Sequence, residues 1–323
     1  MKSALKILIG ISLISIFLIP LSTQFVSGAN DQIQVKEGTD AVTVSTEYIT
    51  MKIMQGMPHF VWWNGNQSTA DEMYNVQYTT LQEFIGNNEI LDNRGELDGI
   101  SYNLITSGWL IDVDEQDLEV TITLTLSGLA NGAELQFIVH IYAEDQPIPG
   151  TDNTVKALQE VKFDIILKDW VFSPNAKGIT LKAQIHESQQ KHRVRMRTNY
   201  DEEVGNKTQT MTFESEEYGN AVVAYYDWTT FADIFYEDEK VSTIDVAAVY
   251  LDAEQQGVGS GFQDSGVINQ WLVYPNYGDS FTMVHDPSIG VEPDSFNVPL
   301  YILPLIAGII TTALIVVAKQ KRN

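Results

Sequence analysis

The sequence contains no cysteine among its 323 residues. This absence excludes a disulfide framework, a catalytic thiolate and zinc sites that use cysteine ligands. It does not argue against export, because a domain of this size can be stable on its hydrophobic core alone. The fold must therefore depend on burial of the hydrophobic residues, which make up 44% of the chain.

Catalytic motifs are also lacking. The five histidines are scattered without metal-binding spacing, and there is no nucleophile elbow, Walker loop or dinucleotide fingerprint. We interpret His140, inside a predicted strand, as a satisfied structural histidine, and His285-Asp286 has no nucleophile beside it in sequence. We therefore expect a non-catalytic protein. The alternative is a glycan-active hydrolase with paired carboxylates, a pair that cannot be chosen from 43 acidic residues.

Positive charge is scarce. The chain has 19 Lys and Arg against 43 Asp and Glu, a net charge of −24. Five of the bases lie at the two ends, so the middle, from Asn30 to Val298, keeps 14 bases against all 43 acids, a net charge of −29. Such a surface repels nucleic acid, so we expect no nucleic-acid partner. It also repels anionic lipid headgroups.

The N-terminal end has the three parts of a secretory signal peptide, which we assign to residues 1–29. Lys2 and Lys6 give the positive start, Ile7 to Leu21 forms the apolar run, and small residues follow. Cleavage after Gly28 or Ala29 fits the small-residue rule. An uncleaved anchor is the alternative, and either one exports the chain that follows.

The C-terminal end predicts a single membrane-spanning helix at 299–318. These twenty residues, Pro299 to Ala318, carry no charge and are long enough to cross the hydrocarbon core. Lys319, Lys321 and Arg322 follow, which favours a cytoplasmic tail at 319–323 with the large domain outside. A buried core helix is the weaker alternative. The proline-rich, acidic segment from Asp286 to Asp294 predicts an extended stalk; we end the folded domain at residue 291 and assign 292–298 to the stalk proper.

Between the ends, alternation of apolar and polar residues predicts an all-β protein. Leu118 to Leu126 and Ile179 to His186 alternate strictly, as half-buried antiparallel strands do. Further strands are predicted at Ala41–Ser45, Tyr48–Gln55, Glu134–Tyr142, Ala157–Leu167, His192–Thr198, Gln209–Glu214, Ala221–Trp228, Val241–Leu251 and Val267–Tyr274. We expect one large antiparallel β-sandwich over residues 30–291. A split into two modules near 173–175 is the alternative.

Three blocks of this domain resemble uncharacterised archaeal cell-surface proteins. They are Val161 to Trp170, Leu272 to Tyr277 and His285 to Val291. Those proteins have a signal peptide, a β-rich ectodomain and a C-terminal single-pass anchor in this order. The resemblance covers about half the ectodomain. It implies the same layout and supplies no catalytic residues.

A row of cations is the first candidate ligand site. Lys191, Arg193, Arg195 and Arg197 alternate along one predicted strand, so all four face the same way. Guanidinium groups match carboxylates, which predicts an anion site for a sulfated or carboxylated glycan. Neutralisation by nearby acids such as Glu214 is the alternative that we favour.

An aromatic strand is the second candidate. Trp62 and Trp63 point to opposite faces of Phe60 to Trp63, so one of them would stack on a sugar ring if it were exposed. Core packing is the favoured alternative, since aromatic residues dominate the cores of sandwiches.

From the predicted anchor and the candidate ligand sites together, the expected partners are the membrane and a glycan or another surface protein.

Acidic loops and sequons complete the candidates. Asp112, Asp114 and Asp117 crowd a predicted loop before a strand, and Asp92, Glu96 and Asp98 crowd another. Such loops can hold Ca²⁺, although neither has EF-hand spacing, and a solvated turn is the favoured alternative. Asn66 and Asn206 begin sequons in polar loops, which predicts glycosylation of an exported chain.

Overall fold

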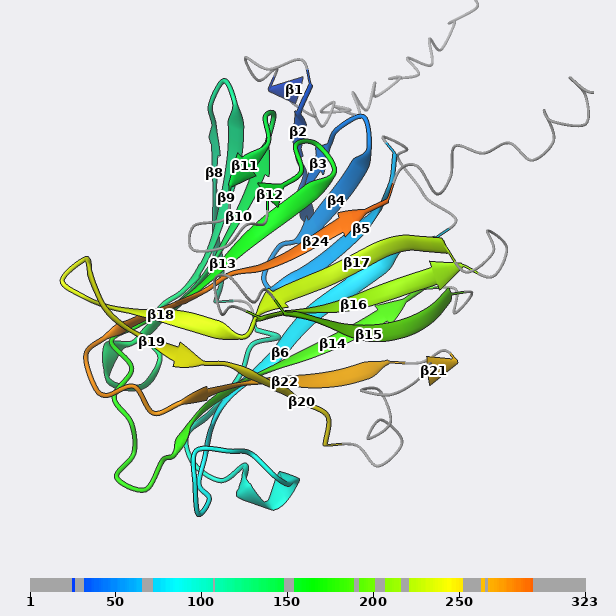
Figure 1. Cartoon of the computed structure of the whole chain (residues 1–323). Coiled ribbons are helices and arrows are strands. Elements are labelled where there is room, and N and C mark those ends of the chain that lie inside the picture. The colour runs from blue at the N-terminus through cyan, green and yellow to red at the C-terminus, as the bar shows by residue number, and fades with distance from the viewer. Residues whose placement is uncertain are drawn as a thin grey trace, which may run out of the picture.

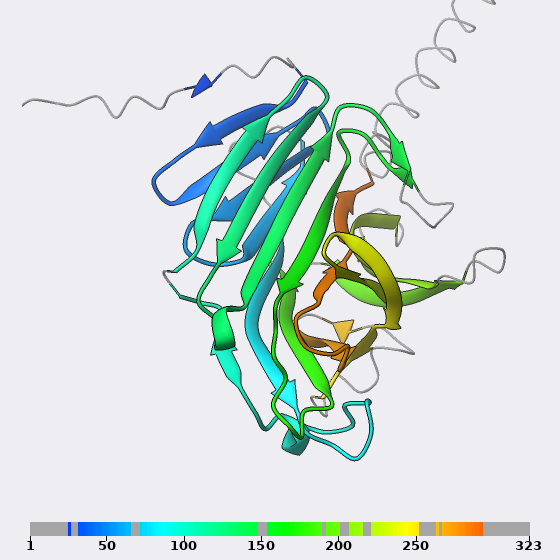
Figure 2. The same ribbon diagram turned by 90° about the vertical axis from the view of Figure 1, so that its left-hand side faces the viewer.

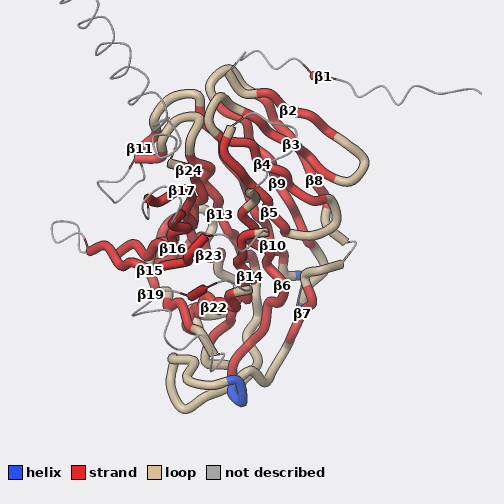
Figure 3. Tube along the Cα trace, turned by 90° about the vertical axis from the view of Figure 1, so that its right-hand side faces the viewer, coloured by secondary structure: helices blue, strands red, loops and turns tan. Residues whose placement is uncertain are grey.

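The computed structural model describes residues 25–26, 32–65, 72–106, 108–147, 154–188, 192–200, 207–215, 221–251, 263–264 and 267–292. In these residues the protein is all-β and antiparallel, as the alternation predicts. The helical turns are two short 3₁₀ segments, η1 (Arg94–Glu96) and η2 (Ala130–Gly132). Figure 3 shows how little of the described chain is helical.

Ten strands form the first sheet, here called sheet A. Its order is β1-β2-β3-β4-β5-β6-β14-β22-β20, with β7 beside β6. The bounds are β1 (Phe25–Val26), β2 (Gln34–Glu37), β3 (Ala41–Ser45), β4 (Ile49–Met54), β5 (His59–Asn64), β6 (Tyr74–Phe84), β7 (Ser101–Asn103), β14 (Gly178–Glu187), β20 (Ala247–Val249) and β22 (Ile268–Pro275).

Twelve strands form the second sheet, sheet B. Its main path is β19-β18-β23-β13-β24-β17-β16-β15-β21, and β10, β9 and β8 continue from the other edge of β13. The bounds are β8 (Leu110–Glu115), β9 (Glu119–Leu126), β10 (Glu134–Tyr142), β13 (Glu160–Lys168), β15 (His192–Tyr200), β16 (Lys207–Ser215), β17 (Ala221–Thr229), β18 (Phe231–Tyr236), β19 (Glu239–Asp245), β21 (Gln263–Asp264), β23 (Thr282–His285) and β24 (Pro287–Val291). A separate hairpin joins β11 (Gln146–Pro147) to β12 (Thr154–Val155).

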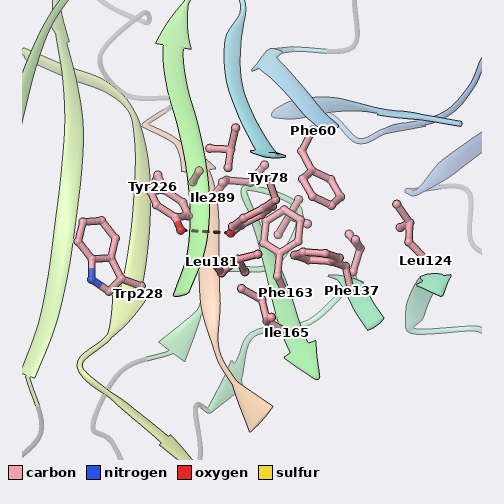
Figure 4. Packing of buried hydrophobic residues seen from close by; sticks show 14 of the residues in the cluster. Phe60, Tyr78, Leu124, Phe137, Phe163, Ile165, Leu181, Tyr226, Trp228 and Ile289 are labelled. Atoms are coloured by element: carbon pink, nitrogen blue, oxygen red, sulfur yellow. Dashed lines mark hydrogen bonds between the residues drawn. The ribbon is translucent and has the colours of Figure 1, made fainter. Parts of the chain in front are cut away.

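The two sheets pack face to face on one hydrophobic core (Figure 1). Figure 2 shows the teal and green strands β8, β9, β10 and β13 as one layer in front of the blue strands of sheet A. Phe60 of sheet A contacts the rings of Phe137 and Phe163 of sheet B, with centroids 5.9 and 4.7 Å away. The hydroxyl groups of Tyr78 and Tyr226 lie 3.1 Å apart and join the sheets inside this core (Figure 4). Aromatic packing of this kind holds the two layers together.

Strands β23 and β24 are two halves of one interrupted strand beside β13. Ile165 is opposite His285 in the first half, and Lys162 is opposite Ser288 in the second. The register is therefore the same on both sides of the interruption, which falls at Asp286 and Pro287. Proline has no N–H to donate to a ladder, which explains the break.

The predicted stalk is wrong over Pro287–Val291. These five residues form β24, all five are buried, and the strand lies between β13 and β17 in the middle of sheet B. The proline and acidic residues of the segment suggested that it is exposed to solvent. Its pairing with a strand on each side instead buries it within the sheet. Residues 293–298 and the predicted helix 299–318 lie outside the described residues. None of the helices that the described residues form is long and apolar enough to span a membrane.

The segment Ser173 to Asn175 is fastened to sheet A. Glu83 of β6 accepts hydrogen bonds from the backbone N–H and the hydroxyl of Ser173, at 2.9 and 2.6 Å, and from the indole N–H of Trp170 at 3.2 Å. Both sheets draw strands from before and after this segment, and one core includes residues from both parts.

Candidate functional site

Polar side chains gather on the outward face of sheet B because its central strands alternate. On β13, Val161, Phe163 and Ile165 point into the core. The residues that alternate with them, Glu160, Lys162 and Asp164, therefore point outward. Strand β10 follows the same rule and places His140 directly opposite Lys162. This alternation gathers ionisable groups from neighbouring strands on one surface.

The centre of this surface is a lysine between two carboxylates. The Lys162 ammonium contacts the Asp164 carboxylate and lies 3.4 Å from Oδ1 of Asp286. The common register of β23 and β24 places Asp286 opposite Asp164 on the neighbouring strand. Like charges opposite each other destabilise a sheet. Lys162 offsets this repulsion, so the three groups form one ionic cluster at the strand interruption.

His140 extends the cluster toward β9. Its Nδ1 lies 2.6 Å from Oε1 of Glu119, and its Nε2 lies 3.3 Å from Oδ2 of Asp164, an ion-pair contact without hydrogen-bond geometry. The imidazole also stacks on the ring of Tyr142, with centroids 5.9 Å apart and planes at 8°. The histidine therefore bridges two strands through two carboxylates. The sequence interpretation of His140 as a structural histidine missed this cluster.

The two aspartates have pKa values displaced in opposite directions. Burial alone would raise the pKa of Asp164, but its contact with His140 and the charge of Lys162 outweigh burial and lower the pKa to about 2. Burial, with the charge of Asp164, raises the pKa of Asp286 to about 6 despite Lys162. The pKa of His140 is raised, because Asp164 and Glu119 outweigh the effect of burial. A charged histidine is thus favoured beside these carboxylates.

A second polar group lies next to this cluster. Ser288 donates a 2.6 Å hydrogen bond to Oε1 of Glu160, and the backbone N–H of Lys156 donates to Oε2 at 3.1 Å. Tyr225 of β17 reaches Glu160 across Gly290 of β24, where a Cβ atom would overlap with the tyrosine ring. Burial is the main reason that the pKa of Glu160 is raised.

Asp227 completes this second group. Its Oδ1 is buried without a hydrogen-bond partner among the described residues. Its pKa is raised to about 7, first by burial and then by the charges of Glu160 and Glu292. A hydrogen bond from Thr210 acts in the opposite direction but is outweighed. The carboxyl group therefore holds its proton into the neutral range.

The charged groups of this cluster form ion pairs with one another. Lys162 occupies the place between the two aspartates, and His140 is engaged by two acids. In the part of the chain that the structure describes, no three His, Asp or Glu residues are placed to hold a metal ion. The cluster can store and exchange a proton, and it presents net negative charge outward.

The predicted sugar-stacking role of Trp62 and Trp63 is wrong. Trp62 is 0% exposed, and its indole N–H donates to the carbonyl oxygen of Gly290 at 3.2 Å. Trp63 is 4% exposed, so neither ring is accessible to a sugar. The two rings lie on opposite faces of β5 and both are buried, which the favoured alternative of core packing anticipated. Tyr226 and Trp228 are likewise buried.

The predicted cation row lies on strand β15. The register places Arg193 opposite Glu214 of β16 and opposite Asp264 of β21. Arg195 and Arg197 are opposite Thr212 and Thr210. Lys191 lies outside the described residues. Neutralisation of the row by nearby acids stays a prediction, with Glu214 and Asp264 as the acids opposite Arg193.

The predicted acidic loop is a strand. Asp112 and Asp114 lie on the outward face of the edge strand β8, opposite Thr123 and Thr121, and only Asp117 lies in the turn that follows. Oδ2 of Asp114 accepts a hydrogen bond from Gln116 at 2.8 Å. In the other acidic loop, Glu96 accepts the backbone N–H of Asp92 at 2.8 Å. Charged residues at an edge strand discourage pairing with other chains, which is a structural reason for these acids.

His285 and Asp286 point to opposite faces of their strand. His285 is fully buried, with its nitrogens 3.0 Å from the Tyr274 hydroxyl and 2.9 Å from the Thr229 carbonyl oxygen. Burial lowers its pKa to about 4. Asp286 faces outward toward Lys162, so the two residues do not form a dyad. The sequons of Asn66 and Asn206 begin outside the described residues.

No protein-family model and no curated protein matches this sequence. A comparison with solved structures finds the Slr1438 protein of Synechocystis sp. PCC 6803 at 10% sequence identity and a TM-score of 0.34. The match covers 80% of this chain and 98% of that chain. At this level of likeness the match supports no conclusion about function.

Proposed function

We propose that this chain is an exported protein held at the cell surface by a single C-terminal membrane helix, with a β-sandwich domain outside. Its role is recognition of a glycan or of another surface protein, or a part in the cell envelope, rather than catalysis. The observation that carries this proposal is the uncharged segment Pro299 to Ala318 followed by Lys319, Lys321 and Arg322. Its length suits the hydrocarbon core, and the basic residues suit the cytoplasmic side.

The fold supports a position close to the membrane. Strand β24 ends at Val291, which leaves seven residues before Pro299. Even fully extended, this link spans no more than about 25–30 Å. The domain would therefore be tethered on a short stalk at 292–298, with its negative charge repelled by anionic headgroups.

Residues 1–29 support export. Phe25 and Val26 pair with β2 as strand β1. Cleavage after Gly28 or Ala29 would remove this short strand, while β2 would keep its pairing with β3. Glycosylation at Asn66 and Asn206 belongs to the same proposal, since both sequons would face the exterior.

Protease accessibility tests the proposal. Protease added to intact cells should degrade the domain of the full-length protein, and a variant truncated before Pro299 should appear in the medium. A cytoplasmic control protein must stay intact in the same cells. A domain that is protected in intact cells, or a truncated product that stays with the membranes, would contradict the proposed topology.

One observation favours a hydrolase as the second candidate. Asp164 and Asp286 have pKa values of about 2 and about 6, and such divergence is typical of paired catalytic carboxylates. A glycosidase, however, needs its carboxylates on opposite sides of the sugar, with space between them. Here Lys162 contacts both, which favours a structural ionic cluster. Glycan hydrolysis by the wild type that is lost in Asp286→Asn would support the enzyme instead.

A further inference from the structure

The outward face of sheet A differs in charge from the central and edge strands of sheet B, which carry many acids. The core residues of β2 to β6, β14 and β22 alternate with residues that point away from the core. Among the described strands of sheet A, no outward-facing residue is an aspartate or a glutamate. The ionisable residues on this face are all potential cations: Lys36, Lys52, His59, Lys182 and His186.

Sheet B has the opposite character. Its outward positions include the acids Asp112, Asp114, Glu119, Glu134, Glu160, Asp164 and Asp227. Three of its lysines are neutralised: Lys162 contacts Asp164, Lys168 lies 3.3 Å from Glu134, and Lys240 lies 2.7 Å from Asp233. Within the described residues, neither Lys52 nor Lys182 of sheet A contacts a carboxylate. The outward positions of the two sheets therefore differ in charge.

Strand register arranges the outward residues of sheet A in rows. One row runs Lys36, Thr43, Lys52, Val61, Asn75 and His186. The next contains His59, Gln77, Gln184 and Asn269, and the third contains Thr80, Lys182 and Trp271. Lys52, His59, Gln77 and Lys182 thus follow a diagonal across four strands. With strands about 4.8 Å apart and residues rising about 3.3 Å, its two lysines are about 20 Å apart.

Two cations meet at the end of this diagonal. The Lys182 ammonium lies 5.1 Å, and the Arg94 guanidinium 5.5 Å, from the centroid of the Trp271 ring. Burial, and then the charge of Arg94, lowers the pKa of Lys182. An anion bound beside Lys182 would favour its charged form.

Uncharged hydrogen-bonding groups fill the space between the cations. Gln184 donates to Asn269 at 3.2 Å, and a nitrogen of His59 lies 3.2 Å from the Asn75 amide oxygen. Burial is the main reason that the pKa values of His59 and His186 are lowered, so both imidazoles are neutral at pH 7. Amides and neutral imidazoles both donate and accept hydrogen bonds, as a polymer of hydroxylated sugars requires.

We propose that the outward face of sheet A binds an extended anionic polysaccharide along the diagonal from Lys52 to Lys182. Carboxylate or sulfate groups of the polymer pair with the two lysines, and its hydroxyl groups bond to His59 and Gln77. The inference rests on the proposed surface role and names the ligand class. A second copy of this chain fits less well, because a stable protein interface needs an apolar centre. The large exposed hydrophobics, Ile90, Ile105, Leu110, Leu118, Tyr236, Val241 and Val267, are absent from the outward strand positions of this face in the described residues.

The test uses the full-length protein in neutral detergent and two matched pairs of polymers. Polygalacturonate is compared with its methyl ester, and dextran sulfate with dextran, at low and high salt. We expect binding to at least one charged polymer, none to its neutral partner, and weakening by salt. Binding to polygalacturonate would identify carboxylate as the recognised group, and binding to dextran sulfate would identify sulfate. Lys52→Gln and Lys182→Gln should each weaken binding severalfold, and the double variant by about tenfold or more.

Lys240→Gln is the matched control, because it removes a lysine that is paired on sheet B. It should bind as the wild type does, and all variants should keep the wild-type melting temperature. Equal binding of the neutral polymers, or an unchanged double variant, would overturn the proposal. So would self-association in sedimentation that Lys52→Gln and Lys182→Gln abolish, since the face would then bind a second copy. None of these results bears on the surface topology, which the protease experiment tests separately.

Discussion

A glycine in the middle of sheet B allows a tyrosine to cross a strand. Tyr225 lies over Gly290, its direct neighbour on β24, and reaches Glu160 on β13. A methyl group at position 290 would overlap with the tyrosine ring. We expect Gly290→Ala to destabilise the protein by about 1–3 kcal/mol, the usual effect of overpacking. Chemical unfolding of the full-length protein in detergent measures the change.

A double-mutant cycle identifies the cause. In a Tyr225→Ala background the overlap is absent, so Gly290→Ala should cost much less than it does in the wild type. Equal costs in the two backgrounds would show that the backbone at 290, rather than the tyrosine, requires glycine.

Asp227 predicts a dependence of stability on pH. Its pKa of about 7 lies above the usual 3.8, so the folded protein keeps a proton that the unfolded chain releases. This contribution to stability is fully present below the pKa of Asp227 in the unfolded chain. It is lost as the pH rises through the folded-state pKa of about 7. Asp227→Asn removes the titration. The free energy of unfolding of the variant, measured relative to that of the wild type, should therefore increase by about 2–4 kcal/mol between pH 4 and pH 8.

The measurement compares urea unfolding of the two proteins across that range. Asp286 and His285 titrate in both proteins, so their effects cancel in the difference. Asp112→Asn, at an exposed position of β8, serves as a control that should show no such trend. A stability difference that is independent of pH would contradict the assigned proton.

At the residue scale, the sequence predicts which way a side chain faces more readily than which partner it meets. The alternation of β10 places His140 outward, but its partners Glu119 and Asp164 come from two other strands. Their pairing depends on register, which one strand's sequence does not contain. Trp62 was ambiguous for a related reason, because its burial depends on which face of β5 packs against the other sheet.

At the element scale, strand β24 shows what composition conceals. Pro287, Gly290 and the flanking acids resemble a linker, yet Ile289 is 0% exposed in the centre of sheet B. We expect Ile289→Ala to cost about 2–4 kcal/mol, as for other large-to-small changes in cores. Val267→Ala is the control, because Val267 is 45% exposed. A cost near zero for Ile289→Ala would restore the stalk interpretation.

Strands with strict alternation were predicted well, and those with interruptions were not. Ala41–Ser45 and Glu134–Tyr142 agree with β3 and β10 at both ends. The predicted strand Val241–Leu251 is divided between β19 and β20, which belong to different sheets. The long strand β6 was missed, because a bulge near Thr79 shifts its inward set from Tyr78 to Leu81 and breaks the period. Bulges and sheet changes are tertiary features that a local period does not reveal.

At the scale of the whole molecule, composition gave the net charge but not its division between the faces. The acids of sheet B come from strands distributed from β8 to β17, and the acid-free face of sheet A comes from β2 to β22. Such a division becomes visible only when the order of strands is known. Electrostatic recognition depends on this distribution rather than on the total charge.

The shared core also predicts how the domain unfolds. Phe60 of sheet A packs against Phe163, and Tyr78 bonds to Tyr226, so residues before and after Ser173 stabilise each other. We expect one cooperative transition, with tryptophan fluorescence and circular dichroism changing together. Met51→Ala and Met211→Ala remove buried side chains on either side of Ser173. Both should shift that same transition downward, because each leaves a cavity in the common core. Two separate transitions, each moved by only one of the variants, would show that the chain folds as two modules.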